Sequence, residues 1–86
     1  MLIRPMISED IPALAELYRQ YWSEPSDVTK MHELFQKLLA RDDYLLLSAV
    51  EENKLVGSVM GIVCEELYGD CRPFLLVEDL IVIAFS

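Results

Sequence analysis

Two adjacent carboxylates, Glu78 and Asp79, interrupt a strongly apolar segment at residues 74–85. A carboxyl group among apolar side chains has a raised pKa, which brings it into a range useful for proton transfer. Because successive side chains of a strand point to opposite faces, only one of the two can face a cleft. In an alternative interpretation, one carboxylate is solvated at a sheet edge and the other accepts hydrogen bonds from a helix end. The sequence leaves both interpretations open.

A second candidate group lies at the end of an apolar helical pattern, where Tyr21, Trp22 and Glu24 combine two aromatic rings with an acid. Aromatic faces and a carboxylate both attract a cation, so these side chains suit an amine ligand. The alternative is that Trp22 is packed against the core and that Glu24 is simply exposed.

No metal site, disulfide framework or phosphate-binding loop is expected. Cys64 and Cys71 have no second pair of cysteines, and we assign no catalysis to the single histidine, His32, because the sequence implies no nucleophilic partner for it. The glycines fit neither of the common nucleotide-binding spacings. They are Gly57, Gly61 and Gly69.

Length and charge restrict the possible partners. The 86 residues are enough for one domain only, which we place at residues 1–86. The formal net charge of −8 repels nucleic-acid phosphates and anionic lipids, so we expect neither nucleic acid nor a membrane as a partner. A cationic small molecule or a basic protein suits this charge better, although the charge can also simply solvate the surface. The N-terminus lacks the features of a signal peptide, and we expect a cytoplasmic protein.

Helical spacing of apolar residues predicts two helices in the first half of the chain. The first has Asp10 as its N-cap, because a start at Ser8 would bring the Pro12 ring against a helix carbonyl. A break at residues 23–27 separates it from the second helix, whose apolar stripe comprises Val28, Met31, Leu34, Phe35, Leu38 and Leu39.

Four further segments have the pattern of strands: residues 2–6, 44–51, 55–65 and 74–85, with a turn at 52–54. In residues 55–65 both alternating sets of side chains are largely apolar, so both faces should be covered. The predicted fold is α/β (α+β), with a mixed, mostly antiparallel four-stranded sheet and two helices in the order β-α-α-β-β-β.

This order, together with three short segments, resembles the N-terminal half of the GNAT (GCN5-related N-acetyltransferase) superfamily. The segments are Ile3-Arg4-Pro5 followed by Glu9-Asp10-Ile11-Pro12-Ala13-Leu14, then Leu55-Val56-Gly57-Ser58-Val59-Met60-Gly61, and finally Leu76-Val77-Glu78-Asp79-Leu80-Ile81-Val82. Each segment alone is weak, but their order and spacing are fairly specific. The resemblance implies a single partial GNAT-like domain that transfers an acetyl group from acetyl-CoA to an amine-bearing small molecule or peptide.

The resemblance also implies roles for individual residues. Glu78, and failing it Asp79, would be the base that removes the ammonium proton. The main chain of Leu80, Ile81 and Val82 would lie along the pantetheine arm of acetyl-CoA, with their side chains in the core. Tyr21, Trp22 and Glu24 would lie where family members close over the acceptor.

After Val82 the sequence lacks the Arg-Gly-x-Gly turn whose backbone holds the coenzyme A pyrophosphate in this family. We therefore expect a truncated chain that is inactive alone and binds acetyl-CoA weakly or not at all. An alternative is a non-catalytic module that forms a homodimer through the exposed strand at residues 74–85. A relic that folds poorly is a third interpretation.

Overall fold

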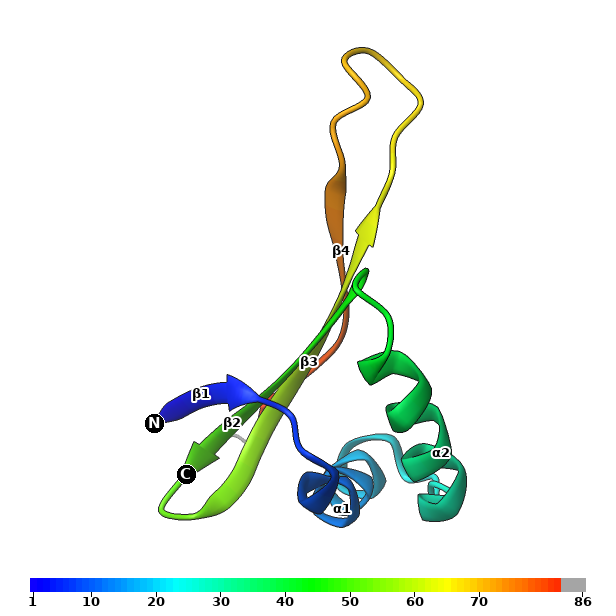
Figure 1. Ribbon diagram of the computed structural model, residues 1–86. Helices are drawn as coiled ribbons and strands as arrows, with labels where there is room; N and C mark the ends of the chain where they lie inside the picture. Colours follow the sequence, from blue (N-terminus) through cyan, green and yellow to red (C-terminus); the bar gives the residue numbers. More distant parts are fainter. Residues whose placement is uncertain (83–86) are drawn as a thin grey trace.

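The computed structural model describes residues 1–82, which form a sheet with two helices on one of its faces (Figure 1). The elements are β1 (Leu2–Pro5), a 3₁₀ turn (Ser8–Asp10), α1 (Ile11–Trp22), α2 (Val28–Leu39), β2 (Tyr44–Glu51), β3 (Lys54–Cys64) and β4 (Phe74–Val82). The strands lie in the order β1-β2-β3-β4, and all three neighbouring pairs are antiparallel. The predicted fold class and element order are confirmed, with an antiparallel rather than mixed sheet. The last positions of the predicted strand at 74–85, residues 83–85, lie outside the described residues.

The N-terminus of α1 differs in detail from the sequence prediction. Asp10 does precede the helix, and Pro12 lies in the first turn as expected, but the Asp10 side chain makes no capping hydrogen bond to α1. The reason is that residues 8–10 already form a 3₁₀ turn, which gives Asp10 helical backbone angles (φ −77°, ψ −18°). A capping side chain normally requires an extended backbone at this position. The Asp10 carboxylate is therefore available for other contacts.

α2 begins as its sequence suggests, because the Asp27 carboxylate accepts a hydrogen bond of 3.1 Å from the backbone N–H of Lys30. Its apolar stripe is only partly covered. Phe35 is buried, whereas Leu34 and Leu39 are both more than half exposed. The predicted helix is confirmed, and its apolar stripe is covered by the rest of the fold only in part.

The sheet is built around the β2–β3 hairpin. Its two-residue turn, Glu52 and Asn53, has positive φ at both positions (50° and 66°), which matches the twist of the flanking strands. The core between sheet and helices comprises Met6, Ile11, Leu14 and Phe35. The expectation that both faces of β3 are covered holds at the successive residues 56–58, which are all buried. It fails at Val63, which is 43% exposed and lies beyond the last residue of β3 that pairs with β2.

Neither helix in residues 1–82 is long and apolar enough to cross a lipid bilayer.

Candidate functional site

A β-bulge lies in β4 at the two carboxylates. Ser58 of β3 faces Ile81, and Met60 faces Glu78, so two steps along β3 correspond to three along β4. Asp79 takes up the extra residue with a left-handed backbone, φ 52°. Aspartate tolerates this region better than most residues. The regular alternation assumed for Glu78 and Asp79 therefore does not hold, because a bulge redirects the side chains on the strand that carries it.

The bulge borders a cavity of about 180 Å³ between the two helices and the sheet. Apolar side chains from α1, α2, β2 and β3 form most of its wall. Three polar residues, Tyr18, Ser58 and Asp79, also line it. Glu78 does not line this cavity, and its side chain is exposed. The geometry thus places Asp79, rather than Glu78, at the cavity.

Tyr18 is the polar residue that connects α1 to the bulge. Burial raises the pKa of its phenol, a hydrogen bond with Ser58 opposes that rise, and the negative charge of Asp79 adds to it. The phenol therefore stays protonated at neutral pH and can donate a hydrogen bond. Tyr18 and Ser58 were not predicted as site residues from the sequence, because each lies in an apolar pattern. The available signal was a polar atom on the buried face of a helix or strand.

The residues predicted to bind the acceptor lie at the C-terminal end of α1 and just after it. Tyr21, Trp22 and Glu24 are all exposed, and none of them lines the cavity. Trp22 is connected to the cavity through Tyr18, since the two rings stack with centroids 4.9 Å apart.

The three residues predicted to lie along the cofactor follow the bulge directly. Ile81 is buried, but Leu80 is 66% exposed and Val82 is also exposed. The expectation that all three side chains belong to the core is therefore wrong for Leu80 and Val82. The reason is that Leu80 and Val82 lie with Ile3 and other strand residues in a shallow pocket that no residue of α1 or α2 lines, so no helix covers them.

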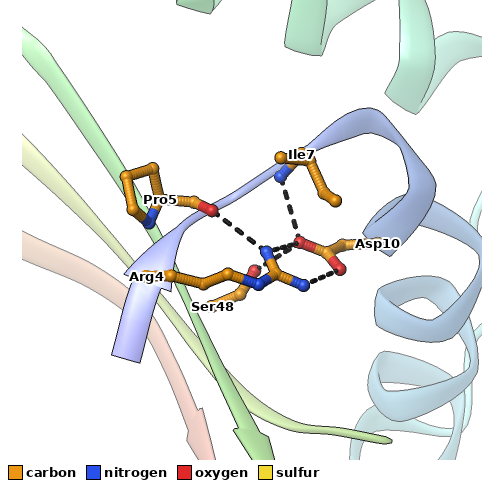
Figure 2. A network of polar contacts seen from close by, with 5 residues as sticks. All are labelled: Arg4, Pro5, Ile7, Asp10 and Ser48. Atoms are coloured by element: carbon orange, nitrogen blue, oxygen red, sulfur yellow. Dashed lines mark hydrogen bonds and ion pairs between the residues drawn. The ribbon is translucent and has the colours of Figure 1, made fainter. Parts of the chain in front are cut away.

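A polar network holds α1 in place beside the sheet (Figure 2). The Arg4 guanidinium donates two hydrogen bonds to the Asp10 carboxylate, of 2.7 and 2.8 Å. The same carboxylate accepts hydrogen bonds from the backbone N–H of Ile7 (3.0 Å) and the buried hydroxyl of Ser48 (2.9 Å). The Arg4 guanidinium, more than any other group, holds the pKa of Asp10 below its usual range. This network is structural, and it positions Ile11, which lines the cavity.

Residues 1–82 contain no group of three or more His, Cys, Asp or Glu side chains placed to hold a metal ion. The structure therefore offers the cavity and its three polar residues, rather than a metal centre, as the candidate site.

Several solved structures with this arrangement are acetyltransferases. A putative acetyltransferase from Agrobacterium tumefaciens str. C58 has a TM-score of 0.82 at 24% identity, covering 96% of this chain and 59% of that chain. A GNAT family acetyltransferase from Staphylococcus aureus has a TM-score of 0.78 at 20% identity, with 94% and 61% covered. A predicted acetyltransferase with acetyl-CoA, from Clostridium acetobutylicum, has a TM-score of 0.66 at 13% identity, with 95% and 59% covered. No family model matches the sequence, and no curated protein matches it significantly.

The chain thus spans 59–61% of the length of these three structures. The matched part contains the elements from β1 to β4 in the order β-α-α-β-β-β. Residues 1–82 therefore have the fold of the N-terminal half of a GNAT acetyltransferase.

Proposed function

We propose that this chain is the acceptor-binding part of an N-acetyltransferase, in which an acetyl group passes from acetyl-CoA to an amine. The observation that carries the proposal is the bulge in β4, which puts the Asp79 carboxylate beside an apolar cavity within a GNAT-like fold. Acetyl-CoA would supply the activated acetyl thioester. The residues of this chain would hold the amine and remove its proton.

The ammonium proton needs an acceptor, and a base on this chain would supply one. An ammonium group must lose one proton before its nitrogen can form the new C–N bond, as the C–S bond of the thioester breaks. Asp79 is the base that we favour, since it lines the cavity with Tyr18 and Ser58. Glu78, which the family resemblance favoured, is the alternative. Tyr21, Trp22 and Glu24 would extend the acceptor site at the surface.

The free edge of β4 fits the amide-containing pantetheine arm. Among the described residues β4 pairs only with β3, so the peptide groups along its other edge can form hydrogen bonds with a ligand. Leu80, Ile81 and Val82 would supply these peptide groups. The sequence offers no glycine-rich loop for the pyrophosphate, so we expect weak binding of acetyl-CoA by this chain.

S-acetylpantetheine, which lacks the pyrophosphate and the nucleotide, provides the sharpest test. Titration of the ¹⁵N-labelled chain with S-acetylpantetheine and with acetyl-CoA should shift the amide signals of residues 79–82 to a similar extent. Stronger binding of acetyl-CoA would reveal a pyrophosphate site that the proposal does not include. If neither compound shifts the amide signals of residues 79–82, the proposed function is overturned.

The base is tested by transfer from S-acetylpantetheine to an amine, followed as release of free thiol. This donor does not need the pyrophosphate contacts whose absence makes the chain inactive with acetyl-CoA, so at high concentration it should support slow transfer. We expect Asp79→Asn to lower the rate at neutral pH, where most of the amine is protonated and needs a base, and Glu78→Gln to lower the rate less. The reverse order would assign the base to Glu78. Equal rates for both variants and the unaltered chain, all above the rate without protein, would exclude a carboxylate base in β4.

The exposed strand supports a second candidate function, a non-catalytic module that pairs with a second copy of the chain through β4. Phe74, Leu75, Leu76 and Val77 are all at least 41% exposed, and an uncovered apolar strand is a template for strand pairing. Sedimentation equilibrium should then give a dimer that Val77→Lys dissociates, whereas Thr29→Lys, which adds the same charge on the exposed face of α2, leaves it intact. A monomer at all micromolar concentrations would exclude this module.

A further inference from the structure

The cavity beside the β4 bulge has a size and a wall that restrict what can enter it. Its volume is about 180 Å³, compared with about 150 Å³ for an engineered apolar cavity that binds benzene. Met6, Ile11, Leu14 and Phe35 form its buried floor. An apolar group with the size of a six-carbon chain or one aromatic ring therefore fits.

The mouth of the cavity lies between α2 and the bulge. Leu34 of α2 and Asp79 of β4 are the exposed members of its wall, whereas its other members are buried or half-buried. A ligand would therefore enter past Asp79 and place its apolar end on the floor.

The polar residues are grouped in a way that specifies the other end of such a ligand. Asp79 is the one charged residue among those that line the cavity within residues 1–82. Tyr18 and Ser58 line the same cavity as Asp79, and the negative charge of Asp79 contributes to the raised pKa of the Tyr18 phenol. No basic side chain of the described residues lines the cavity, so an anion has no partner there. A cation at the mouth can form an ion pair with the Asp79 carboxylate.

We propose that the cavity binds primary amines that carry a compact apolar group, either an alkyl chain of about six carbons or one aromatic ring. The ammonium group contacts the Asp79 carboxylate at the mouth, and the apolar group lies on Met6, Ile11, Leu14 and Phe35. This inference rests on the proposed function in one respect only, namely that such amines are the acetyl acceptors. Their binding is a property of residues that this chain contains.

Binding can be measured on the chain alone by calorimetric titration with ethylamine, butylamine, hexylamine and octylamine at pH 7. A simple alkylammonium group is charged at this pH, as lysine is. We expect the affinity to rise by about fourfold for each added methylene group until the chain fills the cavity, and then to level off. A series with no dependence on chain length would overturn the proposal.

The carboxylate is tested by a matched pair of variants. Asparagine tolerates positive φ as aspartate does, so Asp79→Asn removes the charge and keeps the bulge. We expect it to weaken hexylamine binding by about fivefold, with 1-hexanol binding unchanged. Asp42→Asn removes the same charge from an exposed position outside the cavity and should change neither. Equal weakening by both variants would show that only the net charge acts.

The methionines report the position of the ligand. Met6, Met31 and Met60 line the cavity and Met1 does not, so ¹³C-methyl-methionine spectra contain three probes and one internal control. Hexylamine should shift the three signals and leave that of Met1 unchanged. Shifts of Met1 alone would place the ligand in the separate pocket that Met1 lines with Leu80 and Val82 and overturn the proposal.

The two proposals fail in different ways. If hexylamine shifts the cavity methionines but S-acetylpantetheine leaves residues 79–82 unchanged, the cavity binds amines and the chain is not part of an acetyltransferase. If S-acetylpantetheine shifts the signals of residues 79–82 and an amine without an apolar group is acetylated, but hexylamine does not bind, the acetyl transfer stands and the cavity proposal is wrong.

Discussion

Arg4 and Asp10 face each other across the junction between β1 and α1, joined by two parallel hydrogen bonds of 2.7 and 2.8 Å. Ser48 of β2 donates a third hydrogen bond to the same carboxylate. The side chain of Asp10 is 9% exposed, and a carboxylate removed from water needs such partners. One side chain thus connects the first strand, the first helix and the middle of the sheet.

We expect Asp10→Ala to lower the free energy of unfolding by about 2 to 3 kcal/mol, since it leaves a buried hydroxyl and a backbone N–H without an acceptor. Urea denaturation, followed by circular dichroism, measures the change. The control is Asp70→Ala, which breaks a fully solvated contact of 3.6 Å with Arg72 and should have no measurable effect. A similar loss of stability in both variants would contradict a special role for Asp10.

The same residue predicts a dependence of stability on pH. The pKa of Asp10 is lowered in the folded state, mainly by the hydrogen bonds from Arg4. Its stabilising effect is therefore complete above the unfolded pKa of about 3.9 and is lost as the pH falls through the lower folded value. The difference in unfolding free energy between the unaltered chain and Asp10→Asn should be constant from pH 7 to 5 and shrink below pH 4. A difference that grows toward low pH would refute this assignment.

Gly57 in β3 permits the close approach of β4. A Cβ atom at this position would lie 2.7 Å from the carbonyl oxygen of Ile81, so Gly57→Ala must push the two strands apart. We expect a loss of about 1 to 3 kcal/mol, as for other overpacked sites. Gly69→Asn is the control, because its Cβ meets no atom within 4 Å and asparagine tolerates the left-handed backbone there. Denaturation midpoints that move equally in both variants would contradict this explanation.

The left-handed backbone of Asp79 predicts which residues the bulge accepts. A β-branched residue at φ 52° clashes with its own backbone, so Asp79→Val should cost about 1 to 2 kcal/mol. Asp79→Gly should cost less. Backbone NMR contacts between Met60 and Glu78 should persist in the glycine variant and weaken in the valine variant. Retention of full stability by Asp79→Val would mean that the bulge is absent in solution.

The sequence predicted those elements whose signals are local. β2 was predicted with its observed bounds, Tyr44–Glu51, because a change of apolar period precedes it and turn residues follow it. The start of α1 was predicted from Pro12, because proline is tolerated in the first turn of a helix. The role of Asp10 was not predictable in this way, since its partners Arg4 and Ser48 come from two strands and meet only in the folded sheet.

The candidate site was predictable in part, for a similar reason. The pair of carboxylates stands out in an apolar segment, but its orientation depends on a bulge, and a bulge is a relation between two strands that neither strand shows alone. Tyr18 and Ser58 belong to α1 and β3, and their proximity results from the packing of the helix on the sheet. Long-range pairing therefore determines which of the recognisable residues meet.

The strands differ in length, and this difference determines where the hydrogen bonds of the sheet open most easily. β3 continues past its last partner in β2, so its end and the start of β4 form a two-stranded ribbon that extends away from the helices (Figure 1). An isolated ribbon of two strands is only marginally stable. Amide hydrogens of β4 should therefore exchange with solvent in a gradient, fastest near Phe74 and slowest near Ile81. The end of β4 beside the cavity is the part that the rest of the fold holds closed.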